Sequence, residues 1–151
     1  MTETLQPVPR THHLPGAVVT VLTGGEDTGG QWALLEYRVA PRFPGTPAHW
    51  HAETTEALYV LEGELSLSVD HARRPAGPGT FMRVPPGTVH RLSNDTDQPA
   101  RFLVLVTPAG QEGYLGELAE LIARSPTWPP EHPGVIERLT ARYDQHPSLE
   151  P

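Results

Sequence analysis

Residues 49–56 read HWHAETTE, and they carry the strongest structural signal in the chain. On an extended strand, side chains two positions apart project from the same face, so His49 and His51 point into one space. Glu56 follows a short break and opens an apolar run over residues 57–61. A neighbouring paired strand would return the Glu56 carboxylate to that space, so the segment predicts a shared site for these three side chains.

A second segment, residues 79–90, adds a further histidine. It reads GTFMRVPPGTVH, which predicts a strand, a rigid Pro-Pro-Gly turn and then His90. Three imidazoles and one carboxylate form a mixed nitrogen and oxygen set that suits a first-row transition metal. The predicted ligands of one divalent ion are therefore His49, His51, Glu56 and His90, and the ion stays open among Fe, Mn, Ni, Co and Zn.

The spacing of these residues resembles the two motifs of the cupin family, G(X)5HXH(X)3–4E(X)6G and G(X)5PXG(X)2H(X)3N. Residues 49–63 match the first motif from HXH onward, whereas Gly45 stands four positions before His49 instead of six. That glycine shapes a turn and is not a ligand, so the metal prediction is unaffected. The second motif matches at Gly79, Pro85, Gly87, His90 and Asn94.

The resemblance implies an all-β fold, the cupin double-stranded β-helix or jelly roll, in a protein similar to quercetin dioxygenase-like single-domain cupins. The leading function is then metal-dependent dioxygenation of a small hydroxylated aromatic compound. Four protein ligands leave an open position on the ion, where an enolate or phenolate oxygen can bind. Glu56 and His49 are the candidate catalytic residues, because each can exchange a proton with such a substrate.

Two other functions share every predicted ligand. A zinc ion cannot change its oxidation state, so redox chemistry is excluded with zinc. The same geometry then favours cyclisation, dehydration or isomerisation of a polyketide-like carbonyl compound. A cupin that binds a small molecule without catalysis is the third possibility. One set of nitrogen and oxygen ligands accepts several divalent ions, so the residues leave the three functions open.

The composition agrees with one β-rich domain. The chain has 151 residues with 14 glycines and 18 prolines, which suits an all-β fold with many tight turns. The absence of cysteine excludes disulfides and thiolate ligands. No apolar run reaches membrane-spanning length and the formal charge is −7, so we expect a cytoplasmic protein without a membrane or nucleic-acid partner. The expected partners are a small-molecule substrate and, from the cupin resemblance, a second copy in a homodimer.

Three parts are expected along the chain: a flexible N-terminal arm (1–14), the β-barrel (15–108) and a helical extension (109–151). Apolar residues at helical spacing predict a helix over 113–124 and a second one around 135–143. We expect both helices to pack on the outer face of the barrel; the resemblance to quercetin dioxygenase-like cupins implies that such helices can also cover a barrel mouth. Short, mostly alternating segments predict strands at 17–22, 31–40, 49–51, 56–61, 65–69, 80–84, 89–93 and 101–106.

Residues around the predicted ligands receive simpler roles. Trp50 points away from the ligands by strand alternation, toward packing or a subunit contact. Glu53 lies in a turn, where we expect it to be solvated, and His146 lies near the end of the chain, where we expect it to be exposed. Asn94 and Gly87 serve a turn and its hydrogen bonds. The candidate substrate pocket consists of Leu58, Val60, Met82, Leu92 and Phe102.

Overall fold

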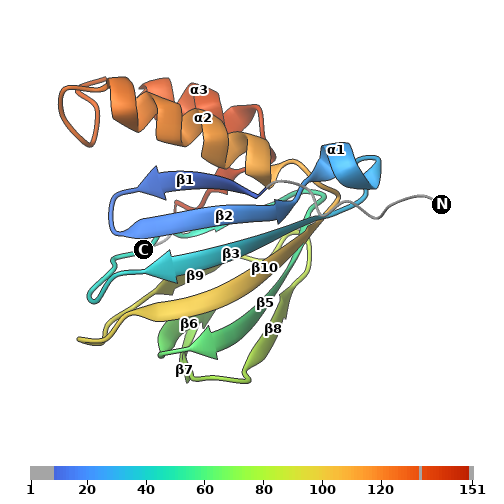
Figure 1. Cartoon of the computed structure of the whole chain (residues 1–151), viewed down its shortest axis with the longest axis vertical. Coiled ribbons are helices and arrows are strands. Elements are labelled where there is room, and N and C mark those ends of the chain that lie inside the picture. Colours follow the sequence, from blue (N-terminus) through green and yellow to red (C-terminus); the bar gives the residue numbers. More distant parts are fainter. Residues whose placement is uncertain (1–8, 133, 150–151) are drawn as a thin grey trace.

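Two antiparallel sheets face each other, and two helices lie across one end of them (Figure 1). The structure, a computed structural model, describes residues 9–132 and 134–149. One sheet has the strand order β1-β2-β3-β10-β5-β8, and the other has the order β11-β4-β9-β6-β7. This architecture confirms the predicted all-β jelly roll with short C-terminal helices.

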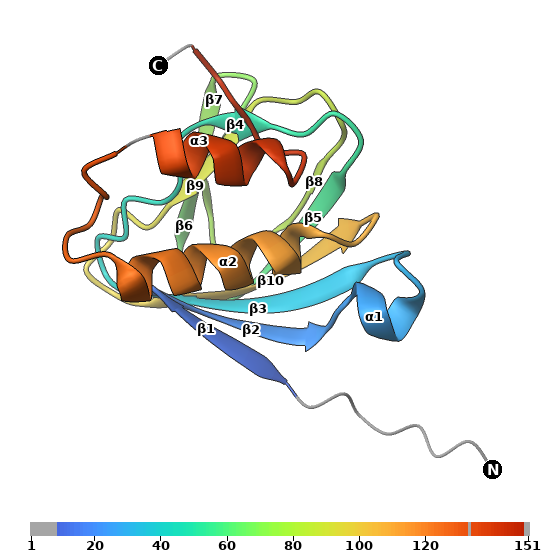
Figure 2. The same cartoon turned by 90° about the horizontal axis from the view of Figure 1, so that it is seen from above.

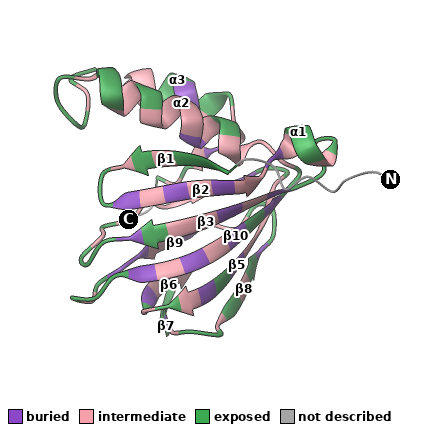
Figure 3. Cartoon of the chain, viewed as in Figure 1, coloured by how far each residue is buried: buried purple, intermediate pink, exposed green. Residues whose placement is uncertain are grey.

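The larger sheet supplies most of the hydrophobic core. Along its central strands, buried positions alternate with more exposed ones, as a sheet with one inward face requires (Figure 3). On β10, for example, Phe102, Val104 and Val106 are buried whereas Leu105 is exposed. The strands of this sheet are Arg10–Leu14 (β1), Ala17–Thr23 (β2), Ala33–Val39 (β3), Thr55–Glu62 (β5), Phe81–Val84 (β8) and Ala100–Thr107 (β10).

The smaller sheet carries the histidines. Its β4 is only two residues long and lies between β9 and β11. The turn after β9 is fixed by Asn94, whose buried amide donates to the carbonyl oxygens of Ala40 (3.1 Å) and Gln98 (2.7 Å). The structural role predicted for Asn94 is thereby confirmed. The strands are His49–Trp50 (β4), Leu65–Val69 (β6), Ala72–Ala76 (β7), His90–Ser93 (β9) and His146–Pro147 (β11).

The predicted N-terminal arm is partly wrong. Residues 10–14 form β1, which pairs with β2 from Arg10↔Val21 to Leu14↔Ala17, so the sheet begins five residues earlier than expected. The polar sequence RTHHL lacks the apolar alternation that identifies a half-buried strand, because β1 is an edge strand and largely exposed. Residues 1–8 lie outside the described part of the chain.

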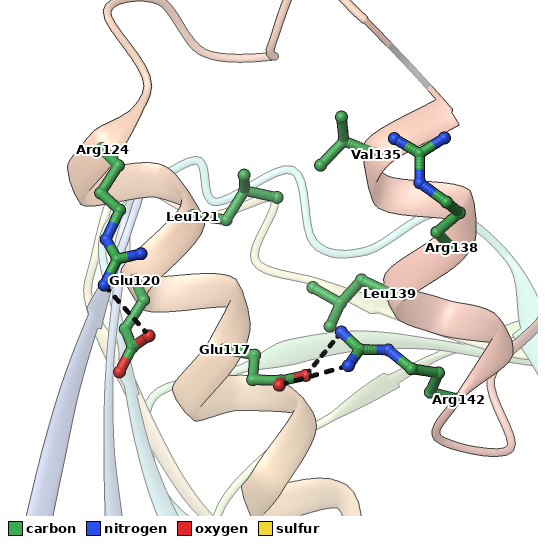
Figure 4. Close-up of a pocket in the computed structure, with 8 residues that line it drawn as sticks. All are labelled: Glu117, Glu120, Leu121, Arg124, Val135, Arg138, Leu139 and Arg142. Atoms are coloured by element: carbon green, nitrogen blue, oxygen red, sulfur yellow. Dashed lines mark hydrogen bonds and ion pairs between the residues drawn. The ribbon is translucent and has the colours of Figure 1, made fainter.

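The C-terminal helices cover an open end of the two sheets instead of the outer face of the barrel (Figure 2). Helix α2 (Gln111–Arg124) contacts β1 and β3, and α3 (Gly134–Ala141) packs beside α2. Across the groove between these helices, Arg142 Nη2 pairs with Glu117 Oε2 at 2.9 Å (Figure 4). The expectation of outer-face packing is therefore wrong, because the apolar side of α2 faces the space between the sheets. A short helix, α1 (Gly25–Thr28), precedes β3.

Candidate metal centre

Strand pairing brings the three predicted histidine ligands together. His49 on β4 is the direct register partner of His90 on β9, and their ring centroids lie 4.4 Å apart. The ring of His51 lies 5.0 Å from that of His49 and 5.2 Å from that of His90. One ring nitrogen from each residue lies within 4.8 Å of the other two. The chain thus contains a histidine cluster capable of binding a metal ion.

Glu56 reaches the cluster from the opposite sheet. It lies on β5, where its register partners are Val84 on β8 and Val106 on β10. Its Oε2 is 2.9 Å from the Nε2 of His90, and its Oε1 is 3.5 Å from the Nε2 of His51. All four residues predicted as ligands therefore meet between the two sheets.

Backbone carbonyls fix how the three imidazoles are oriented. The Nδ1 atoms of His49, His51 and His90 lie 2.9, 2.7 and 2.9 Å from carbonyl oxygens. A carbonyl oxygen only accepts, so each Nδ1 carries the proton and donates it. In a neutral imidazole the lone pair then resides on Nε2, which is the arrangement a metal-binding histidine needs. The Nε2 of His90 lies 2.9 Å from Oε2 of Glu56 and donates to this carboxylate, so it would release a proton on binding an ion. The carbonyl acceptors belong to Pro47, Asp144 and Thr88 respectively.

The electrostatics favour a neutral His49 and a charged Glu56. Burial lowers the pKa of His49 to about 4, so its ring is uncharged at neutral pH. Burial raises the pKa of Glu56, but the neighbouring imidazoles of His51 and His90 outweigh this effect and hold the pKa well below its usual range. Burial also lowers the pKa of His51, yet the neighbouring Glu56 carboxylate reverses the effect and leaves the pKa raised.

The Pro-Pro-Gly turn of the second motif binds the backbone of His51. The N–H of Gly87, in the Pro-Pro-Gly turn, donates to the carbonyl oxygen of His51 at 2.7 Å. Gly87 has φ +80°, a conformation that glycine adopts without steric cost. This contact links the two sequence motifs directly, and it confirms the structural role predicted for Gly87.

An apolar cavity of about 90 Å³ lies beside the cluster. His49, Glu56 and His90 line it, and α2 closes it with apolar side chains such as Leu115 and Leu118. The volume is below the ~150 Å³ of an apolar cavity known to hold benzene. An aromatic substrate therefore requires side chains around the cavity to move aside. Among the predicted pocket residues, the cavity is lined by Leu58, Met82 and Leu92.

The prediction that Val60 and Phe102 line the pocket is wrong. Both are fully buried in the core, and they face each other across β5 and β10. The pairing of Leu58 with Val104 lies between them and Glu56, so they fill the space one layer deeper than the cavity. Phe102 also stacks on Tyr37 at 5.0 Å between ring centroids, and Tyr37 rather than Phe102 lines the cavity.

Residues next to the ligands have distinct surroundings. Glu53 is exposed on the turn before β5 and does not join the histidine cluster. Trp50 stacks on His146, with ring centroids 4.4 Å apart. Of the two roles predicted for Trp50, packing within the chain is therefore the one that the structure shows. His146 is half-buried on β11, because that strand pairs with β4, and the expectation that it is freely exposed is wrong.

Asp144 is the main residue near the site that sequence reasoning missed. Its carboxylate accepts hydrogen bonds from the backbone of residues 52–54, and its carbonyl oxygen accepts from His51. Burial raises the pKa of Asp144, but these backbone donors outweigh it and hold the pKa well below its usual range. No motif includes this residue, and the clearest signal in the sequence is its position just after the second predicted helix.

A two-sheet jelly roll that holds a histidine cluster between its sheets defines the cupin class of fold. Residues 35–106 match the family described as "Cupin domain", so this part of the chain is a cupin domain. The family match includes the three histidines of the cluster and Glu56, and it ends before α2. The two C-terminal helices, α2 and α3, therefore lie beyond the part of the chain that matches the family.

Three relatives show which kinds of protein the chain resembles. It is 29% identical to quercetin 2,3-dioxygenase of Bacillus subtilis over 57% of this chain and 25% of the relative. It is 26% identical to polyketide synthase CurC of Streptomyces cyaneus over 58% of this chain and 65% of the relative. The polyketide cyclase RemF of Streptomyces resistomycificus superposes with a TM-score of 0.59 at 25% identity, over 71% of this chain and 79% of that structure. The chain thus covers less than two thirds of either sequence relative.

Among the described residues, no helix is both long enough and apolar enough to cross a membrane. The cytoplasmic location expected from the sequence stays a prediction.

Proposed function

We propose that the chain is a metal-dependent enzyme whose ion is held by His49, His51, Glu56 and His90. The observation that carries this proposal is the convergence of three imidazoles whose Nδ1 atoms are each bound to a carbonyl oxygen. The Nε2 of His51 is buried without a hydrogen-bond partner. Such an atom is costly unless something takes its lone pair, and a divalent ion would do so.

The residues around the cavity suit acid–base work on a carbonyl compound. A bound divalent ion supplies Lewis acidity toward a substrate oxygen. Glu56 lines the cavity as a carboxylate, so it is the first candidate to take a proton from the substrate. His49 also lines the cavity and is neutral near pH 7, and it is the second candidate. Because its Nδ1 donates to the carbonyl oxygen of Pro47, it could take a proton only through Nε2 and only when Nε2 is not bound to the ion.

Cyclisation of a small polyketide-like carbonyl compound ranks first among the possible reactions. The two polyketide-related proteins match over 65% and 79% of their own lengths, whereas the dioxygenase matches over 25%. In an intramolecular aldol cyclisation, a base removes a proton from the carbon between two carbonyl groups. That carbon then attacks another carbonyl carbon, whose oxygen takes up a proton and becomes a hydroxyl group. Removal of a second proton from the attacking carbon forms a C=C bond, and the hydroxyl group takes up a proton and leaves as water. The reaction needs no oxidant.

Dioxygenation of a hydroxylated aromatic compound is the second candidate. It consumes molecular oxygen as a co-reactant and requires a redox-active ion, in contrast to cyclisation. The resemblance to the Bacillus dioxygenase, at 29% identity over 86 residues, supports it. Because both reactions use the same ligands, the identity of the ion and oxygen consumption distinguish them.

The test is metal analysis of the purified protein, followed by assays of the protein reconstituted with zinc, manganese, iron, cobalt or nickel. We expect one ion per chain, and conversion of a linear polyketone to a cyclic product with loss of water and no oxygen uptake. Oxygen uptake with a flavonol and no cyclic product would replace cyclisation by dioxygenation. Failure of every ion to bind would contradict the metalloenzyme proposal.

A homodimer remains our proposal for the assembly. The outer face of the larger sheet presents Tyr59, Phe81 and Leu105, which are 44, 63 and 37% exposed. Tyr59 and Phe81 are register partners, so they form one apolar patch with Leu105 across β5, β8 and β10. A second copy that packs on this patch would bury it.

Replacing both Tyr59 and Phe81 by glutamate is expected to convert the dimer to a monomer, because each dimer would bury charges in an apolar contact. Size-exclusion chromatography with light scattering measures the mass. Trp128→Glu is the matched control, since Trp128 is an exposed aromatic residue (38%) on the link between the helices. A double variant with the mass of the wild type would contradict this interface.

A further inference from the structure

The segment that follows α3 lies directly against the strand that carries His49. Strand β11 pairs with β4 in the register His146↔Trp50 and Pro147↔His49. The N–H of Ser148 donates to the carbonyl oxygen of Ala48 at 3.0 Å, and the His146 ring stacks on Trp50. The C-terminal segment therefore extends the histidine-bearing sheet by one strand.

Asp144, at the start of this segment, binds the turn between His51 and Glu56. Its carboxylate accepts hydrogen bonds from the N–H groups of Ala52 (2.7 Å), Glu53 (2.9 Å) and Thr54 (3.1 Å), and from the Thr54 hydroxyl (3.0 Å). Hydrogen bonds to a charged acceptor are about twice as strong as neutral ones. The conformation of the turn, and with it the separation of the two ligand positions, is thereby set from outside the barrel.

The backbone of Asp144 acts on His51 itself. The carbonyl oxygen of Asp144 accepts from the Nδ1 of His51 at 2.7 Å, so it fixes both the orientation and the tautomer of this ring. Asp144 adopts a left-handed conformation, with φ +53°. This conformation directs its carbonyl and its carboxylate to the same segment, so one residue holds the ligand and the turn that follows it.

The two C-terminal helices hold Asp144 in place. Arg142 on the same turn pairs with Glu117 of α2 at 2.9 Å, and the Tyr143 ring lies 6.1 Å from that of Tyr114 on α2. Leu139 of α3 is buried beneath them. The helices thus connect the cavity wall to the ligand turn, and they lie beyond the residues that match the cupin domain.

We propose that Asp144 is a positioning residue for the metal centre, through which the C-terminal extension presets His51 and the turn to Glu56 for the ion. This role rests on the proposed metal site. It differs from ordinary packing, because it predicts a change in the affinity and coordination of the ion in a protein that remains folded.

Asp144→Asn is the variant that tests this role. Asparagine tolerates the left-handed conformation and keeps the backbone carbonyl, so the substitution removes the charge and replaces one acceptor oxygen by an NH2 donor. We expect the folded variant to bind zinc about 10- to 100-fold more weakly, as is typical for residues that orient a ligand. Competition with a chromogenic chelator measures the affinity, and the visible spectrum of the Co(II) form reports a changed coordination geometry.

Asp97→Asn is the matched control, because it removes the same charge from an exposed ion pair with Arg42. It is expected to leave zinc affinity and the Co(II) spectrum unchanged. Circular dichroism and thermal unfolding of the metal-free proteins establish that each variant is folded at the assay temperature. A purely structural role would lower the unfolding temperature without changing the spectrum or the affinity of the folded protein.

The outcomes separate this role from the metal site on which it rests. If the wild type binds zinc and folded Asp144→Asn binds it equally, with the same Co(II) spectrum, the positioning role is overturned. If the wild type binds no ion, the metal site itself is overturned and this role with it. Should Asp144→Asn fail to fold, Thr54→Val decides, since it removes one hydrogen bond to the carboxylate. An unchanged affinity in folded Thr54→Val would then overturn the proposal.

Discussion

His51→Ala is expected to lower the metal affinity by more than ~100-fold, beyond the effect of residues that only orient a ligand. His51 is 3% exposed, its Nδ1 is held by Asp144, and its Nε2 faces Glu56 and the other two histidines. Alanine removes one of the four proposed ligands, and the cluster found among the described residues contains no histidine beyond His49, His51 and His90. The purified variant should contain less metal per chain than the wild type by elemental analysis, and competition with a chromogenic chelator should measure the loss of affinity.

His13→Ala is the control for this loss, since His13 lies exposed on the edge strand β1. It should retain the metal content of the wild type, and circular dichroism should show both variants to be folded. Catalytic activity should fall in parallel with metal content in His51→Ala alone. A folded His51→Ala that keeps one ion with the affinity of the wild type would contradict the assignment of His51 as a ligand.

The candidate ligands were predictable because the spacing of the motifs encodes their geometry. Alternation on a strand places His49 and His51 on one face, and the structure confirms that they lie in one cluster with His90. The distance of each inward-pointing residue from the mouth of the barrel could not be predicted in the same way. Alternation says that Val60 and Phe102 point inward, but it does not say that they lie one layer below the cavity.

The elements that sequence reasoning missed are edges and short pieces. Strand β7 reads ARRPA and β1 reads RTHHL, and both are mostly exposed, so no apolar pattern identifies them. Strand β11 is two residues long and exists only because β4 offers it an edge. Asp144 acts on residues about 90 positions away in the chain, and no local pattern carries such a contact.

The sequence did not favour the covering of the cavity by α2 over packing on the outer face, for a related reason. Helical periodicity shows that Leu115 and Leu118 share an apolar face, but it does not show which apolar surface that face meets. In the structure this face closes the space beside the histidine cluster. The candidate substrate pocket is therefore lined jointly by the cupin domain and by the extension, so we expect substitutions in either part to change specificity.

Gly45→Ala is expected to destabilise the protein by at least ~3 kcal/mol, the upper range for single substitutions. Gly45 has φ +77°, where an alanine costs about 1–2 kcal/mol. In addition, a Cβ at this position would lie 1.7 Å from the carbonyl oxygen of Leu92 and 2.8 Å from its carbonyl carbon. These are backbone atoms of β9, so they cannot move aside as a flexible side chain can.

Gly29→Ala separates the two causes of this effect. Gly29 also has a positive φ, of 65°, but nothing lies within 4 Å of an added Cβ, so only the conformational cost of about 1–2 kcal/mol applies. Urea unfolding of the metal-free proteins measures both variants. A Gly45→Ala protein as stable as Gly29→Ala would contradict the close approach to β9.

The same clash should also weaken zinc binding. Because β9 begins with His90 and Gly45 precedes His49, the clash should separate the two strands of the metal centre. Any folded Gly45→Ala protein should therefore bind zinc more weakly, whereas Gly29→Ala should not.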